Sequence, residues 1–282
     1  MQELPVGTIH AMRVQEATAG GYIVVKGTMR ATLITMETYE EEDLIDVFLY
    51  QNNDNELIAT TSTPSVVVGT YGWVEVKDKI PHLGVFVSIG IADEVLIFKE
   101  DLPAFKSVWP EPGDKLYVTL KVDGKNRLLA NPATERIFED VFDFAENVDL
   151  NETVKGTIIR VDREGAVVLT EENYRGFIHY TERDKEPRLG EFVTGRVIEV
   201  KENGTLNVSL KPMKHERLED DAETILAYLE EAGGEMDFGD RSDATAIRNT
   251  FQMSKSAFKR ALGGLMRQKK IDQRDGKTYL LK

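Results

Sequence analysis

The chain has 282 residues, with 35 Lys and Arg against 49 Asp and Glu, and a formal net charge of −14 at pH 7. A hydrophobic content of 41% excludes wholesale disorder, and the absence of cysteine excludes disulfides, thiolate metal sites and cysteine nucleophiles. No apolar run reaches the roughly 18 residues of a membrane span, and there is no signal-peptide pattern, so we expect a cytoplasmic protein with no membrane partner. The acidity opposes a polyanion partner unless positive charge gathers in one segment.

Three units in the first part of the chain show the same order of sequence signals. Each opens with a glycine and an alternating apolar strand, at Gly7, Gly72 and Gly156. Each continues with a second apolar strand and closes with two strands around a polar turn. Several short strands in so few residues are typical of a small Greek-key barrel. We therefore predict three tandem barrels, over residues 1–64, 65–132 and 150–212.

Residues 133–149 separate the second and third units. Ile137, Phe138, Val141 and Phe142 follow helical spacing. The spacing predicts a linker helix that packs on a barrel, with its aromatic residues in the core rather than on a binding surface.

After the third unit, the pattern changes from strands to helices. Residues 220–232 have one apolar face and stop at a Gly-Gly pair. Two shorter helices follow, with Ser242 and Ser254 expected at their N-caps, and then a hairpin around an Asp-Gly turn. This order predicts an α+β winged-helix domain over residues 213–282.

Charge is segregated along the chain. Residues 1–64 carry a net −7, residues 65–149 a net −6, and residues 150–212 a net −1. Residues 213–240 carry a net −8, whereas residues 241–282 hold 11 basic and 3 acidic residues, a net +8. The C-terminal segment is therefore where a polyanion is expected to bind.

The basic segment has a helical geometry. Lys255, Lys259, Gly263 and Arg267 recur every four residues, so they form one ridge on the expected third helix, with Arg260 beside it. Four more basic residues extend this surface toward the hairpin: Lys269, Lys270, Arg274 and Lys277. We expect the surface to contact nucleic acid; the alternative is a solvated face that binds the acidic stretch before it.

Gly263 and Gly264 lie in the middle of the expected helix, where each costs about 1 kcal/mol relative to alanine. Two interpretations remain open. The glycines allow close approach of a phosphate backbone or another domain, or they pack tightly against a neighbouring helix.

The third unit carries ordered motifs at residues 165–168, 176–179 and 206–211. They resemble the S1 RNA-binding domain, a five-stranded oligonucleotide-binding barrel. The resemblance implies that RNA bases stack on aromatic rings of the second and third strands. His179 occupies the family's third-strand histidine position, and Phe177, two residues earlier, shares its face.

This unit departs from the S1 pattern on its second strand. Glu164 and Val167 stand where the family usually has aromatic residues. Other side chains are expected to take part in RNA binding instead: Arg160, Arg163, Tyr174, Arg175 and Lys211. The second unit fits the pattern more loosely, and the first is the most divergent.

Three S1-like barrels followed by a winged helix form a distinctive order. With the stretches 46–60, 84–90 and 253–266, this order resembles the bacterial conserved virulence factor B family, also called YitL-like S1 proteins. The resemblance implies a cytoplasmic RNA-binding regulator of virulence gene expression, without known catalysis.

The residues offer no sign of an enzyme: no histidine pair has metal-ligand spacing, and neither a phosphate-binding loop nor a nucleophile elbow is present. We expect no cofactor and no metal. The predicted function is post-transcriptional regulation by binding RNA, single-stranded rather than duplex, through the third barrel and the winged helix. Two alternatives remain: a winged-helix DNA-binding transcriptional regulator, and an adaptor that binds the ribosome or RNA polymerase through its acidic N-terminal barrels.

Overall fold

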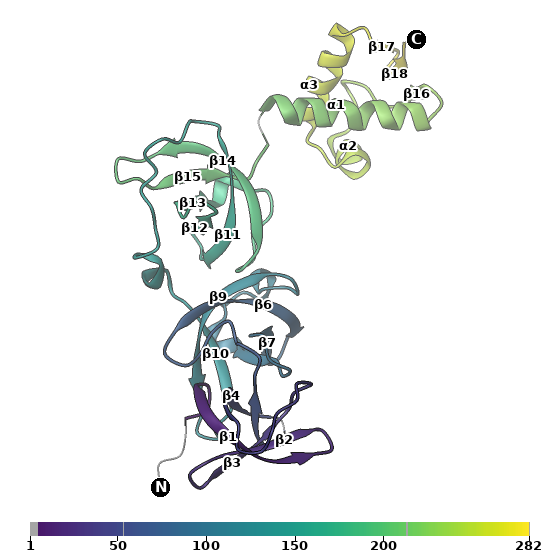
Figure 1. The fold of residues 1–282 in the computed structure, drawn as a ribbon. Helices are drawn as coiled ribbons and strands as arrows, with labels where there is room; N and C mark the ends of the chain where they lie inside the picture. The colour runs from purple at the N-terminus through teal and green to yellow at the C-terminus, as the bar shows by residue number, and fades with distance from the viewer. Residues whose placement is uncertain (1–4, 53, 213, 282) are drawn as a thin grey trace. The chain divides into compact units, whose positions relative to one another are not determined.

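The computed structural model describes residues 5–52, 54–212 and 214–281. For residues 214–219 it describes the backbone and not the side chains. The chain divides into two compact units, Met1–Lys211 and Pro212–Lys282. The first contains three closed five-stranded barrels and the second contains helices with a small sheet (Figure 1). The predicted fold class, mainly β with tandem barrels and a winged helix, is confirmed.

The three barrels share one strand order. In each barrel the strands follow the order 1-2-3-5-4, and the fourth strand pairs with the first to close the barrel. The third and fifth strands are parallel. The first barrel consists of β1 (Ile9–Thr18), β2 (Gly21–Lys26), β3 (Met29–Leu33), β4 (Leu44–Gln51) and β5 (Leu57–Thr60). The second consists of β6 (Tyr71–Ile80), β7 (Gly84–Ser88), β8 (Val95–Phe98), β9 (Lys115–Val122) and β10 (Leu128–Pro132). The third consists of β11 (Thr153–Val161), β12 (Gly165–Thr170), β13 (Arg175–His179), β14 (Phe192–Val200) and β15 (Leu206–Ser209).

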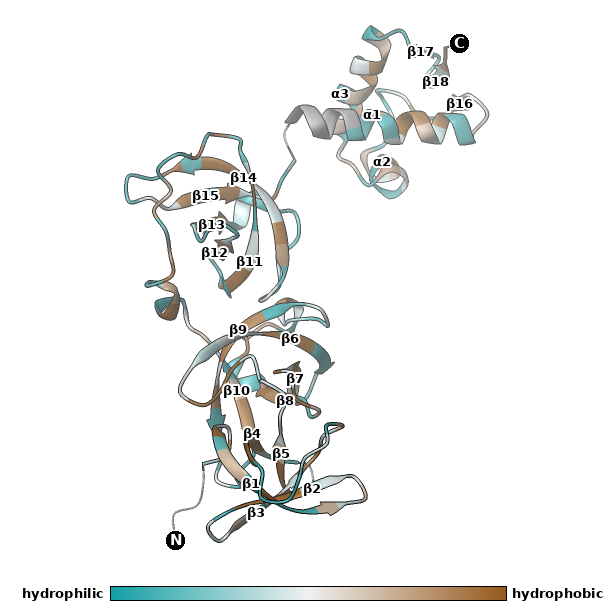
Figure 2. Ribbon diagram, viewed as in Figure 1, coloured by the Kyte–Doolittle hydropathy of each residue, from teal (hydrophilic) through white to brown (hydrophobic). Residues whose placement is uncertain are grey.

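Alternation along the strands explains the barrels. In β6, Val74 and Val76 are buried while Trp73 and Glu75 are exposed, as a strand with one face on a core requires. The hydrophobic residues of the strands are coloured brown in Figure 2. The long first strand of every barrel also carries a bulge, between Val14 and Glu16, Val76 and Asp78, or Ile158 and Arg160. A bulge bends the strand, which lets it pair with two neighbours around a small barrel.

The first and second barrels share one apolar cluster. Phe48 and Ile58 of the first barrel belong to the same buried cluster as Val85 of the second. The start of the first barrel approaches the second closely at Gly7, where φ is +83° and an added Cβ would lie 2.5 Å from Val68. Only glycine fits both the conformation and the space.

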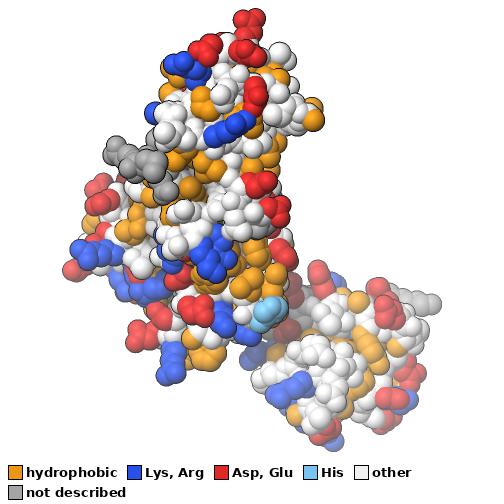
Figure 3. All heavy atoms as spheres, turned by 90° about the horizontal axis from the view of Figure 1, so that it is seen from below, with side chains coloured by type: hydrophobic (Ala, Val, Ile, Leu, Met, Phe, Trp, Pro, Cys, Tyr) orange, Lys and Arg blue, Asp and Glu red, His pale blue; other side chains and the backbone are white. Residues whose placement is uncertain are grey.

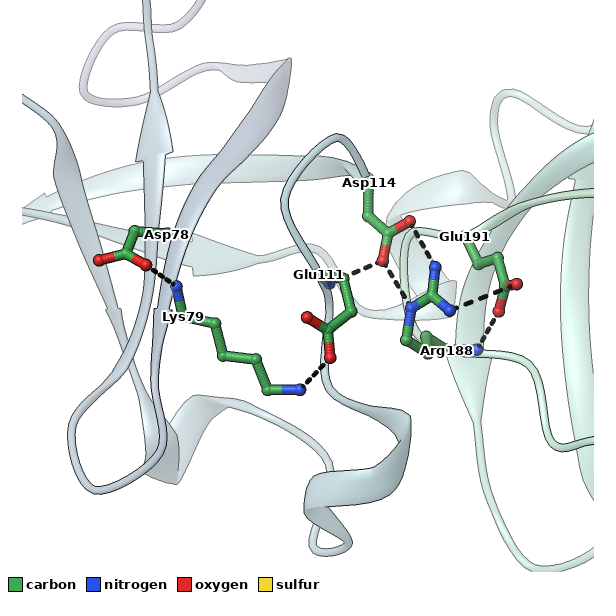
Figure 4. A network of polar contacts seen from close by, with 6 residues as sticks. All are labelled: Asp78, Lys79, Glu111, Asp114, Arg188 and Glu191. Atoms are coloured by element: carbon green, nitrogen blue, oxygen red, sulfur yellow. Dashed lines mark hydrogen bonds and ion pairs between the residues drawn. The ribbon is translucent and has the colours of Figure 1, made fainter.

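A loop of the third barrel inserts into the second (Figure 4). Arg188 donates from Nε and Nη2 to the carboxylate of Asp114, at 3.0 and 3.1 Å. This hydrogen-bonded contact raises the pKa of Arg188 above its ordinary value. The next residue, Leu189, is buried in the apolar cluster of the second barrel, and the backbone N–H of Lys115 donates to Gly190 O at 3.1 Å. The side chains and the backbone thus fix this joint together.

The prediction of a linker helix over 133–149 is wrong. The segment forms only a short 3-10 helix, η3 (Glu135–Phe138), followed by turns. Phe138 and Phe142 pack in a cluster with Ile159 and Val167 of the third barrel. A helix this short is marginal by itself, so packing against the barrels decides the path of the chain.

The second unit has the elements of a winged helix. They are α1 (Lys214–Glu231), β16 (Glu235–Met236), α2 (Ala244–Phe251), α3 (Lys255–Arg267), β17 (Ile271–Arg274) and β18 (Lys277–Leu280). Its sheet has the order β16-β18-β17. Ile225 of α1, Phe251 of α2, and Phe258 and Leu262 of α3 meet in one core. The short strand β16 was not predicted.

The helix caps agree with the sequence at one of two positions. Ser254 is the N-cap of α3, as expected. The N-cap of α2 is Asp243, not Ser242, because Asp243 accepts hydrogen bonds from the N–H groups of Thr245 and Ala246. These bonds lower the pKa of Asp243. Ser242 instead accepts from the backbone N–H of Gly239.

Candidate nucleic-acid interface

His179 ends strand β13 as an exposed residue whose ring is held by a neighbouring threonine. Its Nδ1 lies 2.7 Å from Thr181 Oγ1, and the backbone N–H of Thr181 donates to the same nitrogen at 3.3 Å. Because a backbone N–H only donates, we assign the proton of the neutral ring to Nε2. The ring then offers an N–H donor to a ligand.

An exposed tyrosine, which the sequence analysis missed, lies against this ring. Tyr180 begins the short helix η4 (Tyr180–Glu182) and is 56% exposed. Its ring centroid is 4.3 Å from that of His179. The sequence gives no signal for Tyr180, because it follows the end of β13 and lies outside the alternating pattern of that strand. Exposed aromatic rings of this kind are able to stack on unpaired bases.

Phe177 is only half-buried and belongs to the joint between barrels. It packs in the cluster that contains Phe138 and Val167, and its ring covers Gly165, where an added Cβ would lie 2.7 Å from the ring. Its ring centroid is 6.4 Å from that of His179. The structure therefore brings the two predicted residues together, with His179 more open to a ligand than Phe177.

Two of the predicted arginines form ion pairs with the same carboxylate. Arg160 on β11 and Arg175 on β13 both form ion pairs with Glu135 of η3, the latter at 2.6 Å. Arg160 Nε also lies 3.1 Å from Asp162. The sequence could not reveal this, since Glu135 is 25 and 40 residues away. These arginines hold the linker against the third barrel.

The remaining predicted residues of the third barrel differ in their availability. Arg163 is exposed and makes no ion pair with any side chain that the structure describes. Tyr174 is half-buried and packs on the barrel core, with a backbone bridge to Asp143. Lys211 lies 3.9 Å from Asp184. Of these, Arg163 is the open cation.

Helix α3 carries exposed cations. Lys259, Arg260 and Arg267 are exposed, and none forms an ion pair within the described side chains. Arg267 Nε donates to Gly263 O at 3.2 Å, one turn earlier. Lys255 is half-buried, with its Nζ 3.5 Å from Arg241 O. The ridge is therefore open from Lys259 onward.

The two glycines of α3 face open space. An added Cβ at Gly263 or Gly264 would meet nothing within 4 Å among the described residues. This leaves no described neighbouring helix in tight contact with them. They flatten the helix surface beside the cations.

The cations after α3 divide into two groups. Lys277 Nζ lies 2.7 Å from Glu235 and 2.9 Å from Asp237, which raises the pKa of Lys277, and Arg274 pairs with Asp272 at 2.7 Å. The other two are exposed, without an ion pair in the part of the chain that the structure describes: Lys269 and Lys270.

One face of the molecule mixes both signs of charge. On the face drawn in Figure 3, basic and acidic side chains are interspersed, with hydrophobic ones exposed between them. Across the described residues, no group of three His, Asp or Glu side chains could hold a metal ion. None of the described helices is long and apolar enough to cross a membrane.

Family models match every part of this arrangement. "S1 domain" matches residues 6–62, and "CvfB first S1-like domain" matches 71–131. "Virulence regulatory factor CvfB, second domain" matches 138–212, and "CvfB-like winged helix domain" matches 223–280. The barrels and the winged helix thus each have a counterpart among known domains.

Relatives match almost the whole chain. It is 42% identical to "Uncharacterized protein YitL" of Bacillus subtilis, over 95% of this chain and 91% of that one. It is 37% identical to "Conserved virulence factor B" of Staphylococcus aureus, over 98% and 94%. A crystal structure from Streptococcus pneumoniae, described as a multidomain protein with nucleic acid binding domains, is 36% identical, covers 98% of both chains and has a TM-score of 0.69.

Proposed function

Because the chain belongs to the conserved virulence factor B family, we propose that it is a non-catalytic, cytoplasmic RNA-binding regulator that acts on virulence gene expression after transcription. The nucleic acid binding domains named for the pneumococcal relative support the binding activity. The proposed ligand is single-stranded RNA.

The observation that carries this proposal is the exposed, unpaired charge of α3. Lys259, Arg260 and Arg267 are free to neutralise phosphates, with Lys269 and Lys270 extending the surface. Phosphate contacts supply affinity that does not depend on sequence. Rings supply the base contacts: His179 and Tyr180 on the third barrel.

Single-stranded RNA is favoured over duplex because stacking requires unpaired bases. The rings of His179 and Tyr180 can contact a base only when its face is open. Helix α3 supports duplex DNA less well: besides Lys and Arg, its exposed positions include no Asn or Gln between Lys255 and Arg267 that could read an adenine edge.

The test is filter binding of the full chain to single-stranded RNA, duplex RNA and duplex DNA of matched sequence, at salt from about 50 to about 200 mM. We expect the tightest binding to single-stranded RNA, with affinity that falls as salt rises. Tighter binding to duplex DNA would instead support a transcriptional regulator. Absence of binding to all three at the lowest salt would support the adaptor.

A further inference from the structure

A cavity of about 330 Å³ lies between the first and second barrels. Its size is within the range of about 300–1,000 Å³ that small-ligand sites occupy. One wall comes from the end of β4 in the first barrel, and the other from β7 and β8 in the second. Its lining includes neither His179 nor any residue of α3.

The second barrel supplies an apolar wall with two phenyl rings. Phe86 on β7 is directly opposite Leu96 on β8, and Phe98 is two residues further along the same face. All three line the cavity and are half-buried. Such a wall suits a flat, unsaturated ring system.

The first barrel contributes an oriented amide to the lining of the cavity. Gln51 lines the cavity, and its Nε2 donates to Asn55 O at 3.0 Å, which sets the orientation of the amide. Its Oε1 is buried beneath the cavity surface and accepts no hydrogen bond from the residues that the structure describes.

Two carboxylates add further acceptors. Asp93 and Glu94 both line the cavity, and Glu94 is exposed without an ion pair to any described side chain. Asp93 faces the buried hydroxyl of Tyr50; burial, together with this negative charge, raises the pKa of Tyr50. The tyrosine therefore stays protonated, and the cavity presents mostly acceptors.

We propose that this cavity binds a guanine base. The base would lie against Phe86 and Phe98 and donate its N–H groups to the carboxylates of Asp93 and Glu94. Guanine has two adjacent donors, N1–H and the 2-amino group, which match one carboxylate in a bidentate pair. Adenine has no donor at N1 and no 2-amino group.

The carboxylates also determine which part of a nucleotide enters. They repel phosphate, and the only cation in the lining, Arg127, is already paired with Asp123 at 2.7 Å. The site therefore takes the base alone, and any phosphate of the ligand stays outside the cavity. Free guanosine and a guanine in single-stranded RNA are the two sources of this chemistry.

The test is calorimetric titration of the full chain with guanosine, adenosine and guanosine monophosphate, and with the pentanucleotides UUGUU and UUAUU. We expect guanosine or UUGUU to bind at least about tenfold more tightly than its adenine counterpart. Binding by guanosine identifies the free nucleoside as a source; binding by UUGUU alone identifies the RNA. Equal binding of the guanine and adenine ligands, or binding of none, would overturn the proposal.

Variants locate the site. Glu94→Gln and Phe86→Leu should each weaken guanine binding about tenfold. The matched controls lie outside the lining: Glu100→Gln for the carboxylate and Phe105→Leu for the ring, which is 61% exposed. The controls should leave guanine binding unchanged. Unchanged binding in both Glu94→Gln and Phe86→Leu would overturn the assignment.

Discussion

The third barrel and the winged helix both appear cation-rich along the sequence, but their cations are in different states. In the barrel, Arg160 and Arg175 share Glu135, and Lys211 lies near Asp184. On α3, Lys259 and Arg260 are exposed without a described carboxylate partner. A count of charges therefore overstates what the barrel can offer to a phosphate.

The difference suggests separate roles for the two regions in RNA binding. When an unpaired cation binds a phosphate, it releases counterions that were condensed on the nucleic acid. A paired cation must first break its ion pair. The winged helix would then supply affinity, and the rings of His179 and Tyr180 would supply contacts to bases.

The largest expected effect comes from reversing the open charge. Lys259→Glu with Arg260→Glu should weaken single-stranded RNA binding about 100-fold near 0.1 M salt, and lower the slope of log K against log salt by about 1.4, the value for two phosphate contacts. Filter binding over a salt series measures both. An unchanged slope would remove α3 from the interface.

Removing the exposed ring of the barrel should have a smaller effect. His179→Ala should weaken RNA binding about tenfold, since stacking on one ring is worth about 1–3 kcal/mol per base. The salt slope should not change, because no phosphate contact is lost. His82→Ala, an exposed histidine of the second barrel, is the matched control. Equal losses in both variants would contradict a specific role for His179.

Removing the carboxylate partner of the paired arginines should make the third barrel bind RNA phosphates more strongly, as the exposed cations of α3 are expected to do. Glu135→Gln frees Arg175 and leaves Arg160 with Asp162 as its single carboxylate partner, so RNA binding should tighten about threefold, with a steeper salt slope. Glu139→Gln, an exposed residue in the same segment, is the control. Weaker binding in Glu135→Gln would show that the arginines act only by positioning the linker.

The smallest effect is expected at a cation that is already neutralised. Arg274→Gln should change RNA affinity less than about twofold, because Arg274 pairs with Asp272. Lys270→Gln, at an exposed and unpaired lysine beside the same hairpin, should cost about threefold. A larger loss at Arg274 than at Lys270 would contradict the view that pairing decides availability.

Local patterns predicted most of the fold. Strand alternation and turn residues recur in each barrel, and the apolar spacing of α3 and its Ser254 cap can be read directly from neighbouring residues. Sequence patterns gave the wrong structure at two places. The predicted linker helix is the short helix η3 followed by turns, and the N-cap of α2 is Asp243 rather than Ser242. Strand β16, two residues long, is too short to leave a period.

The candidate sites depended more on contacts between distant residues. The sequence by itself determined the three barrels, the winged helix and the location of the basic segment, because each follows from periodicity or composition over neighbouring residues. Only the tertiary structure decided that Glu135 pairs with two arginines, that Tyr180 lies against His179, and that Gln51 and Phe86 line the same cavity. The physical reason is that burial and ion pairing depend on which strands and loops meet in space, and no local pattern encodes those meetings.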